Sequence, residues 1–284
     1  MSIKQKTLKN NFSYIDIQNK YATARIALQG AHVFAYQVVD KPVLLWLSDA
    51  AYFIEGKAIR GGIPLCFPWF GKHKSDDTLP KHGFARTSLW ELVLEKELAD
   101  ASCHVQLKLC ESSQSLALWD YKFELTLDVY VGEALRVVLS VHNTDRRAFE
   151  VGTALHTYFQ VSHIDDVRIE GLDHTMYYDA LTQSTHTQKG TLSINEETDR
   201  VYQTHNNTLS FSDAKCSTSI ESKGSASVVV WNPWKEKSQA MADMTDDGYK
   251  SMVCLETSNA REDTRWVKPS EVHKVEVMLR QNER

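Results

Sequence analysis

Four segments of this 284-residue sequence combine charged and aromatic side chains in patterns that could do chemistry. They are residues 60–71 (RGGIPLCFPWFG), 81–86 (KHGFAR), 155–159 (LHTYF) and 253–257 (VCLET). His156 and Glu256 lie in apolar, strand-like runs, and Arg60 and Arg86 lie beside aromatic, glycine-rich stretches. Burying a charge is unfavourable unless the charge is paired or functional. Together, the four side chains therefore favour a small site for an anionic ligand.

Each of these residues also has an ordinary structural explanation when it is taken alone. An arginine after a turn is commonly a solvated surface charge, and a histidine between apolar residues is commonly a hydrogen-bonded core side chain. A single glutamate in a strand usually faces water. Only the combination points to function.

Two other patterns resemble metal sites but lack their ligands. Residues 243–248 (DMTDDG) resemble the start of a calcium loop, but Cys254 stands at the twelfth position, where a bidentate glutamate is needed. His73, Asp76, Asp77 and His82 lie in a polar loop without metal-ligand spacing. We expect no metal, and we expect this loop to be a mobile lid.

The elements that must position these residues show a period of two. Apolar and polar residues alternate over 103–109, 121–130, 135–141 and 275–279. This alternation is typical of antiparallel strands with one buried face and one wet face. Breaks at 132–133 and 143–145 predict turns between consecutive strands.

The predicted fold is all-β, a single antiparallel β-sandwich domain over residues 1–284. No long stretch has helical periodicity, and one short helical turn is expected over 48–53, capped by Ser48. No linker or change in composition divides the chain, and sheet-on-sheet packing accounts for the alternation.

Composition indicates a cytosolic protein without a nucleic-acid or membrane partner. The net charge is −5, without a basic patch for nucleic acid or a membrane surface. The five cysteines are scattered and are expected to be reduced thiols. The N-terminal residues do not form a signal peptide, and no window reaches the ~20 apolar residues of a membrane span.

The sequence resembles the hexose-6-phosphate mutarotase (glucose-6-phosphate 1-epimerase) branch of the galactose-mutarotase-like superfamily. The matching segments lie between residues 59 and 260 in the same order as in the family. They are IRGGIPLCFPWFG, HGFAR, LHTYF, ETDRVY, VVWNPW and VCLETSNA. The resemblance implies a β-supersandwich that acts without a cofactor, as a monomer, on a phosphosugar.

The resemblance also implies roles for matching residues. His156 resembles the family's general acid and Glu256 its general base. Arg60 and Arg86 resemble substrate-binding arginines suited to the phosphate, because the guanidinium fork matches its oxygens. Asp199 resembles a sugar-hydroxyl ligand, and His82 a pocket-lining residue. Lys81 stands where the family often has glutamine, which adds a candidate phosphate partner.

Mutarotation exchanges two anomers through the open-chain aldehyde. A base removes the proton of the anomeric hydroxyl while an acid protonates the ring oxygen, which calls for two proton-transfer groups on opposite sides of the sugar. Four aromatic residues are candidates either for stacking on the sugar or for core packing: Trp69, Phe70, Trp231 and Trp234. Two alternatives are an aldose 1-epimerase for unphosphorylated sugars and a non-catalytic sugar-binding sandwich.

Overall fold

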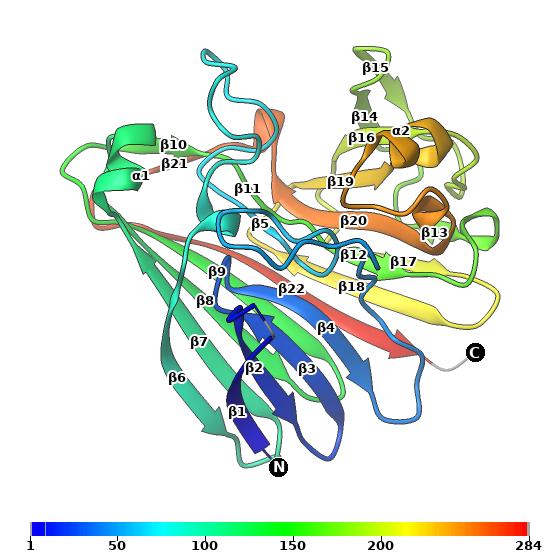
Figure 1. Ribbon diagram of the computed structural model, residues 1–284. Helices are drawn as coiled ribbons and strands as arrows, with labels where there is room; N and C mark the ends of the chain where they lie inside the picture. Colours follow the sequence, from blue (N-terminus) through cyan, green and yellow to red (C-terminus); the bar gives the residue numbers. More distant parts are fainter. Residues whose placement is uncertain (1, 9, 283–284) are drawn as a thin grey trace.

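A computed structural model describes residues 2–8 and 10–282, which form mostly antiparallel strands (Figure 1). Eight strands form what we call the long sheet. In spatial order they are β13 (Arg168–Glu170), β17 (Thr208–Ser212), β18 (Ser217–Lys223), β22 (Val272–Asn282), β9 (Leu135–Asn143), β8 (Phe123–Val131), β7 (Cys103–Cys110) and β6 (Glu91–Glu97).

Two further sheets lie against the long sheet. The N-terminal sheet contains β1 (Ser2–Thr7), β2 (Ser13–Gln18), β3 (Ala22–Ala27) and β4 (His32–Val38). The site sheet runs in the order β15 (Ser184–Thr187), β14 (Met176–Asp179), β16 (Thr198–Gln203), β19 (Ser227–Asn232), β20 (Met252–Asn259), β11 (Thr153–Leu155) and β5 (Leu65–Cys66), with β12 (Tyr158–Gln160) also paired to β20. A separate pair joins β10 (Phe149–Val151) to β21 (Arg265–Val267).

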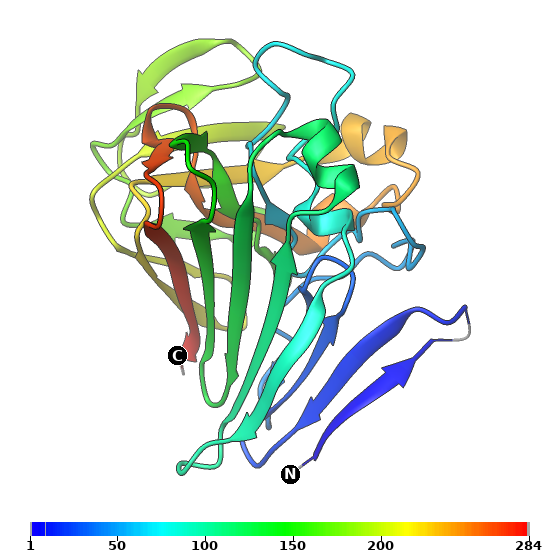
Figure 2. The same ribbon diagram turned by 90° about the vertical axis from the view of Figure 1, so that its left-hand side faces the viewer.

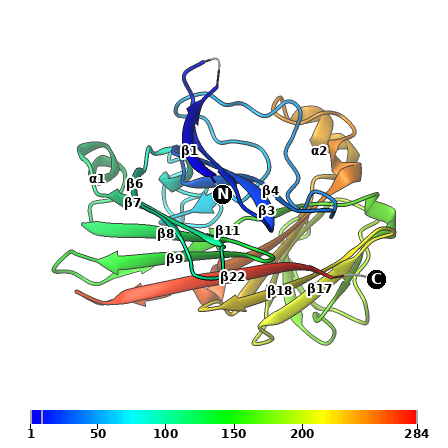
Figure 3. The same cartoon turned by 90° about the horizontal axis from the view of Figure 1, so that it is seen from below.

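The N-terminal sheet is seen lying over the long sheet from below (Figure 3). Strand β3 contacts β8, and strands β20 and β11 contact β22. Ile15, Leu127 and Leu255, one from each sheet, belong to a single cluster of buried apolar side chains. The all-β antiparallel prediction is therefore confirmed.

Burial explains which strands alternate. Strand β8 alternates strictly between buried and partly exposed residues, as its sequence predicts. Strands β19 and β20, in contrast, are buried at every residue, because both faces of the site sheet are covered there. Edge strand β6 is mostly exposed and carries charges that discourage pairing with other chains. The predicted turns after Val131 and Asn143 are present.

Over residues 2–8 and 10–282, helix is confined to short pieces. These are α1 (Ser113–Leu118), α2 (Trp234–Ala240) and 3₁₀ turns at Ala85–Thr87, Ile164–Asp166, Gly248–Ser251 and Arg261–Asp263. Figure 2 shows α1 and α2 at the same end of the molecule, beyond the ends of the long strands. Within the described residues, no helix is long and apolar enough to cross a membrane.

The helical turn expected over 48–53 is wrong. The segment makes a single tight turn, in which the Ala51 amide donates to the Ser48 carbonyl (3.0 Å) and the Ala50 amide donates to Ser48 Oγ (3.1 Å). The Ser48 amide donates to the Arg60 carbonyl (3.0 Å). The Ser48 side chain does cap a turn, but no helix follows. The bond from the Ser48 amide to the Arg60 carbonyl instead aligns this part of the chain with the segment around Arg60.

Candidate active site

Register brings the four chemistry-bearing segments side by side. Strand β11 lies between β5 and β20, with Ala154 opposite Cys66 and Leu155 opposite Thr257. The segment with HGFAR joins them through a bridge between Phe67 and Gly83. Residues from three widely separated parts of the chain thus meet on one side of the site sheet.

His156 and Glu256 meet at the break between β11 and β12. The break is held because the His156 amide donates to the Pro64 carbonyl (3.0 Å) and the Leu255 amide to the Thr157 carbonyl (3.2 Å). His156 Nε2 then lies 3.3 Å from Glu256 Oε1. His156 is 8% exposed and Glu256 is 1% exposed. We call this pair the dyad.

Burial moves the two pKa values of the dyad in opposite directions. Loss of solvation raises the pKa of Glu256 well above its ordinary value, and the nearby Asp199 carboxylate raises it further. Loss of solvation lowers the pKa of His156 well below its ordinary value, and the cations Arg86 and Arg60 lower it further. Both shifts favour the uncharged forms.

Each dyad member also has one polar atom without a partner. His156 Nδ1 and Glu256 Oε2 are buried and have no hydrogen bond within the described residues. An unsatisfied buried polar atom is unfavourable by about 1–3 kcal/mol. Both atoms can accept a hydrogen bond from a polar ligand or donate one to it.

Arg60 lies close to the dyad but is already engaged. Its Nε and Nη2 donate to Asp243 Oδ2 at 3.2 and 3.1 Å, and its Nη1 donates to the Tyr158 hydroxyl at 2.8 Å. The Tyr158 ring stacks on His156, with centroids 4.9 Å apart and planes 6° apart. Arg60 therefore supports the dyad through Tyr158.

Arg86 and Lys81 form a second positive region. Arg86 lies in the 3₁₀ turn Ala85–Thr87 and donates from Nη2 to the Lys81 carbonyl (2.9 Å). Burial raises the pKa of Asp199, and the charge of Lys81, an exposed residue, opposes this rise. Burial lowers the pKa of His82, and the charges of Arg86 and Lys81 lower it further. Both cations are therefore close enough to influence residues beside the dyad.

His82 and Asp199 border the dyad on different sides. The His82 ring packs edge-on against His156 with centroids 5.7 Å apart, and its Nδ1 accepts the Gly71 amide (3.2 Å). Asp199 pairs with Trp231, which pairs with Cys254, so these side chains share one face of the site sheet. Burial raises the pKa of Asp199, and the nearby carboxylates Glu197 and Asp179 raise it further.

The four aromatic candidates fall into different places. The ring centroids of Trp231 and His156 are 6.2 Å apart, and those of Phe70 and His82 are 5.0 Å apart. Both aromatic side chains therefore border the site. Trp69 instead donates to the Pro80 carbonyl (2.9 Å), at the end of the polar loop. Trp234 packs on Tyr249 (5.2 Å).

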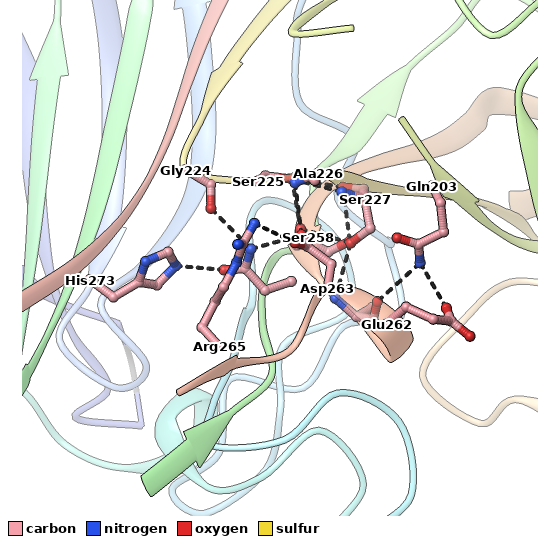
Figure 4. Close-up of polar contacts among 12 residues, drawn as sticks. Gln203, Gly224, Ser225, Ala226, Ser227, Ser258, Glu262, Asp263, Arg265 and His273 are labelled. Atoms are coloured by element: carbon pink, nitrogen blue, oxygen red, sulfur yellow. Dashed lines mark hydrogen bonds and ion pairs between the residues drawn. The ribbon is translucent and has the colours of Figure 1, made fainter. Parts of the chain in front are cut away.

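A cavity of about 850 Å³ lies toward the other end of the same strands, lined by residues that include Gln203, Ser225, Glu262 and Arg265. Among the described residues, none of the predicted site residues lines it. Its wall is a polar network (Figure 4) in which Asp263 Oδ2 accepts the Ala226 amide (2.7 Å). Most polar groups there are used to hold the end of β20 in place.

Comparison with known proteins places the chain in a family. A candidate glucose-6-phosphate 1-epimerase of Escherichia coli K12 is 34% identical over 263 residues, which covers 91% of this chain and 87% of that protein. The crystal structure of a candidate mutarotase, YeaD, from Salmonella typhimurium superposes with a TM-score of 0.93 at 30% identity, covering 99% of this chain and 94% of that one.

A galactose mutarotase-like protein from Lactobacillus casei shares the fold, with a TM-score of 0.76 at 14% identity over 95% of this chain and all of that one. The family model described as aldose 1-epimerase matches residues 13–280. The chain belongs to the aldose 1-epimerase family.

Proposed function

We propose that the protein interconverts the α and β anomers of D-glucose 6-phosphate and related hexose 6-phosphates, without a cofactor, in the cytoplasm. The observation that carries this proposal is the buried contact of 3.3 Å between His156 and Glu256, bordered by cations. The relatives named for glucose-6-phosphate epimerisation support the same substrate class.

Ring opening needs the dyad in its charged form. Glu256 takes the proton of the anomeric hydroxyl, O1 forms a double bond to C1, the C1–O5 bond breaks, and O5 takes a proton from His156. The dyad is then neutral. Burial favours that neutral form, so the protein stabilises the dyad while the open-chain aldehyde is present.

Ring closure reverses these transfers after C1 has rotated. O5 attacks the other face of C1 and returns its proton to His156, while O1 takes the proton held by Glu256. The dyad recovers its starting state, and no redox or hydrolytic partner is consumed.

The contact distance also determines how the sugar must approach. A pyranose ring does not fit between atoms 3.3 Å apart, so the dyad does not enclose the sugar from opposite sides as the sequence suggested. O1 and O5 are both bonded to C1, and both can meet the dyad from its open side. Asp199, Trp231 and His82 would then bind the remaining hydroxyls and the ring face.

Phosphate recognition is assigned to Arg86 and Lys81, with Arg60 behind them. The sequence predicted that Arg60 and Arg86 bind the phosphate together. We assign Arg60 a secondary role, because three of its donors already bond to Asp243 and Tyr158. A charge-assisted hydrogen bond contributes roughly 1.5–3 kcal/mol. Arg86 alone is therefore sufficient to discriminate between phosphorylated and free sugars.

His156→Ala and Glu256→Gln test the proposal. Each should lower the catalysed rate of anomer exchange of glucose 6-phosphate, measured by NMR exchange spectroscopy, by at least ~10²-fold, since a positioned acid or base contributes ~10²–10⁴-fold. Thermal unfolding checks that both variants are folded. A folded variant with wild-type turnover would remove that residue from the mechanism.

The Arg60–Asp243 ion pair favours one alternative, a mutarotase for free sugars, because it neutralises one of the two expected phosphate ligands. Equal specificity constants for glucose and glucose 6-phosphate would establish that alternative. Sugar binding without catalysed exchange would indicate a binding module instead.

A further inference from the structure

Cys254 lies beside the dyad and takes no part in the proton transfers proposed above. It stands two residues before Glu256 on β20, so both side chains point to the same face. One ring nitrogen of His156, Cys254 Sγ and one carboxylate oxygen of Glu256 lie within 4.8 Å of one another, and all three residues are buried.

We propose that His156, Cys254 and Glu256 form a site for a thiophilic divalent cation, Zn²⁺ above all, whose binding blocks the dyad and inhibits the enzyme. The proposed inhibition rests on the enzymatic function proposed above. The proposed metal binding does not depend on that function.

The spacing suits tetrahedral zinc. Two nitrogen or oxygen ligands about 2.0 Å from such an ion lie roughly 3.3 Å apart. His156 Nε2 and Glu256 Oε1 already have this separation, at 3.3 Å. Zinc–sulfur bonds of about 2.3 Å place the thiolate roughly 3.5 Å from each partner, so a shift of about 1–1.5 Å at most completes the set.

The donor types select the metal. A mixed nitrogen, sulfur and oxygen set is typical of zinc, whereas Mg²⁺ and Ca²⁺ require oxygen ligands. Coordination displaces the thiol proton, and any proton on Glu256, to solvent. Three protein ligands leave the fourth position to water.

Coordination would abolish proton transfer. A metal on His156 and Glu256 occupies the lone pairs that exchange protons with the sugar. The two unpartnered buried atoms, His156 Nδ1 and Glu256 Oε2, give these side chains freedom to turn toward an ion without breaking a hydrogen bond. Sugar and metal would therefore compete.

The experiment adds Co²⁺ and then Zn²⁺ to the full-length protein. Co²⁺ should produce a thiolate-to-cobalt charge-transfer absorption at one equivalent, and Zn²⁺ should abolish it. Neither observation depends on activity, so it tests the site even if the proposed substrate is wrong. Zn²⁺ should also inhibit anomer exchange competitively with the sugar, and Mg²⁺ should not.

Cys254→Ala should remove the absorption, keep basal exchange within about twofold, and raise the inhibition constant of Zn²⁺ at least about tenfold, because even losing an outer partner weakens metal binding 10–100-fold. Cys103→Ala, at an equally buried cysteine on β7, is the matched control and should change nothing. Cys254→Ser fills the same volume if the alanine variant is unstable.

Retention of the absorption in Cys254→Ala would overturn the site. Loss of the absorption in Cys66→Ala alone would also overturn the site. Cys66 Sγ lies 3.2 Å from His82 Nδ1, so these two residues are the alternative ligands.

Discussion

A buried carboxyl beside a buried imidazole resists charge separation, and this decides how the dyad works at the residue scale. Glu256 and His156 are each stabilised in their neutral forms, by burial in both cases. In the mechanism proposed above, the ionic form is needed only at the moment when the sugar hydroxyl and ring oxygen arrive. The cations Arg86 and Arg60 oppose a charged His156, so we expect them to act on the binding of an anionic substrate more than on proton transfer.

Arg86→Ala should separate phosphate recognition from catalysis. Because Arg86 gives one hydrogen bond to the Lys81 carbonyl, most of its donors can meet a phosphate. Its loss should lower kcat/KM for glucose 6-phosphate by about 10–100-fold, the equivalent of one charge-assisted bond. Exchange of free glucose should stay within about twofold. Equal losses on both substrates would show that Arg86 only supports the fold.

Arg60→Ala should behave differently, although the sequence pairs it with Arg86. Its removal leaves Asp243 without its ion-pair partner and Tyr158, which stacks on His156, without its hydrogen-bond donor. We expect kcat to fall for both glucose and glucose 6-phosphate. A loss confined to glucose 6-phosphate KM would instead place Arg60 directly on the phosphate.

Sequence predicts some neighbours of the dyad better than others. Cys254 stands two residues before Glu256 on β20, so strand periodicity alone could have placed it beside the dyad. Tyr158 stands two residues after His156 but across the break between β11 and β12, where strand periodicity does not apply. Asp243 could not be found this way, because it meets Arg60 from a loop 183 residues away. His32, which contacts Gly61, is equally hidden in sequence.

At the scale of elements, backbone contacts between segments position the site. Strand periodicity predicted the long strands, but α1 and α2 have six and seven residues, too few for a repeat of 3.6 to stand out. The bridge from Phe67 to Gly83 could not be predicted either. It joins the two glycine-containing segments and thereby sets where His82 and Arg86 lie.

Gly83→Ala should therefore disrupt the pocket. A Cβ there would lie 1.9 Å from the Phe67 carbonyl oxygen, far inside contact distance, and φ is +69°. Gly71→Ala is the control, since φ is +74° but no atom lies within 4 Å of the added Cβ. We expect Gly71→Ala to cost about 1 kcal/mol from the backbone conformation alone. Gly83→Ala should lower Tm and kcat/KM considerably more, and similar effects of both would exclude the close approach as the cause.

At the scale of the whole molecule, three sheets share one core, and the site lies where their coverage buries both faces of β20. Alternating residues predicted antiparallel sheets, but sequence does not specify which strands become neighbours: β20 pairs with β19, β11 and β12. The order of the strands depends on packing between residues that are far apart in the sequence. The single domain over 1–284 stays a prediction.

His32 links this global packing to acid stability. It is fully buried on β4, its Nε2 donates to the Gly61 carbonyl (2.7 Å), and burial lowers its pKa from 6.5 to about 4, helped by the Arg86 charge and opposed by the Gly61 hydrogen bond. The unfolded chain therefore binds one more proton than the folded protein between these values. Stability is full above pH 6.5 and falls as the pH drops toward 4, by about 3 kcal/mol for this group.

His32→Gln keeps a donor for Gly61 and removes the titration. Urea unfolding at pH 7 and pH 4.5 should show that the variant loses about 2–3 kcal/mol less stability on acidification than the wild type. His174→Gln, at an exposed histidine, should follow the wild-type curve. If His32→Gln and the wild type lose the same stability on acidification, acid sensitivity arises elsewhere in the core and His32 is only a packing residue behind Gly61.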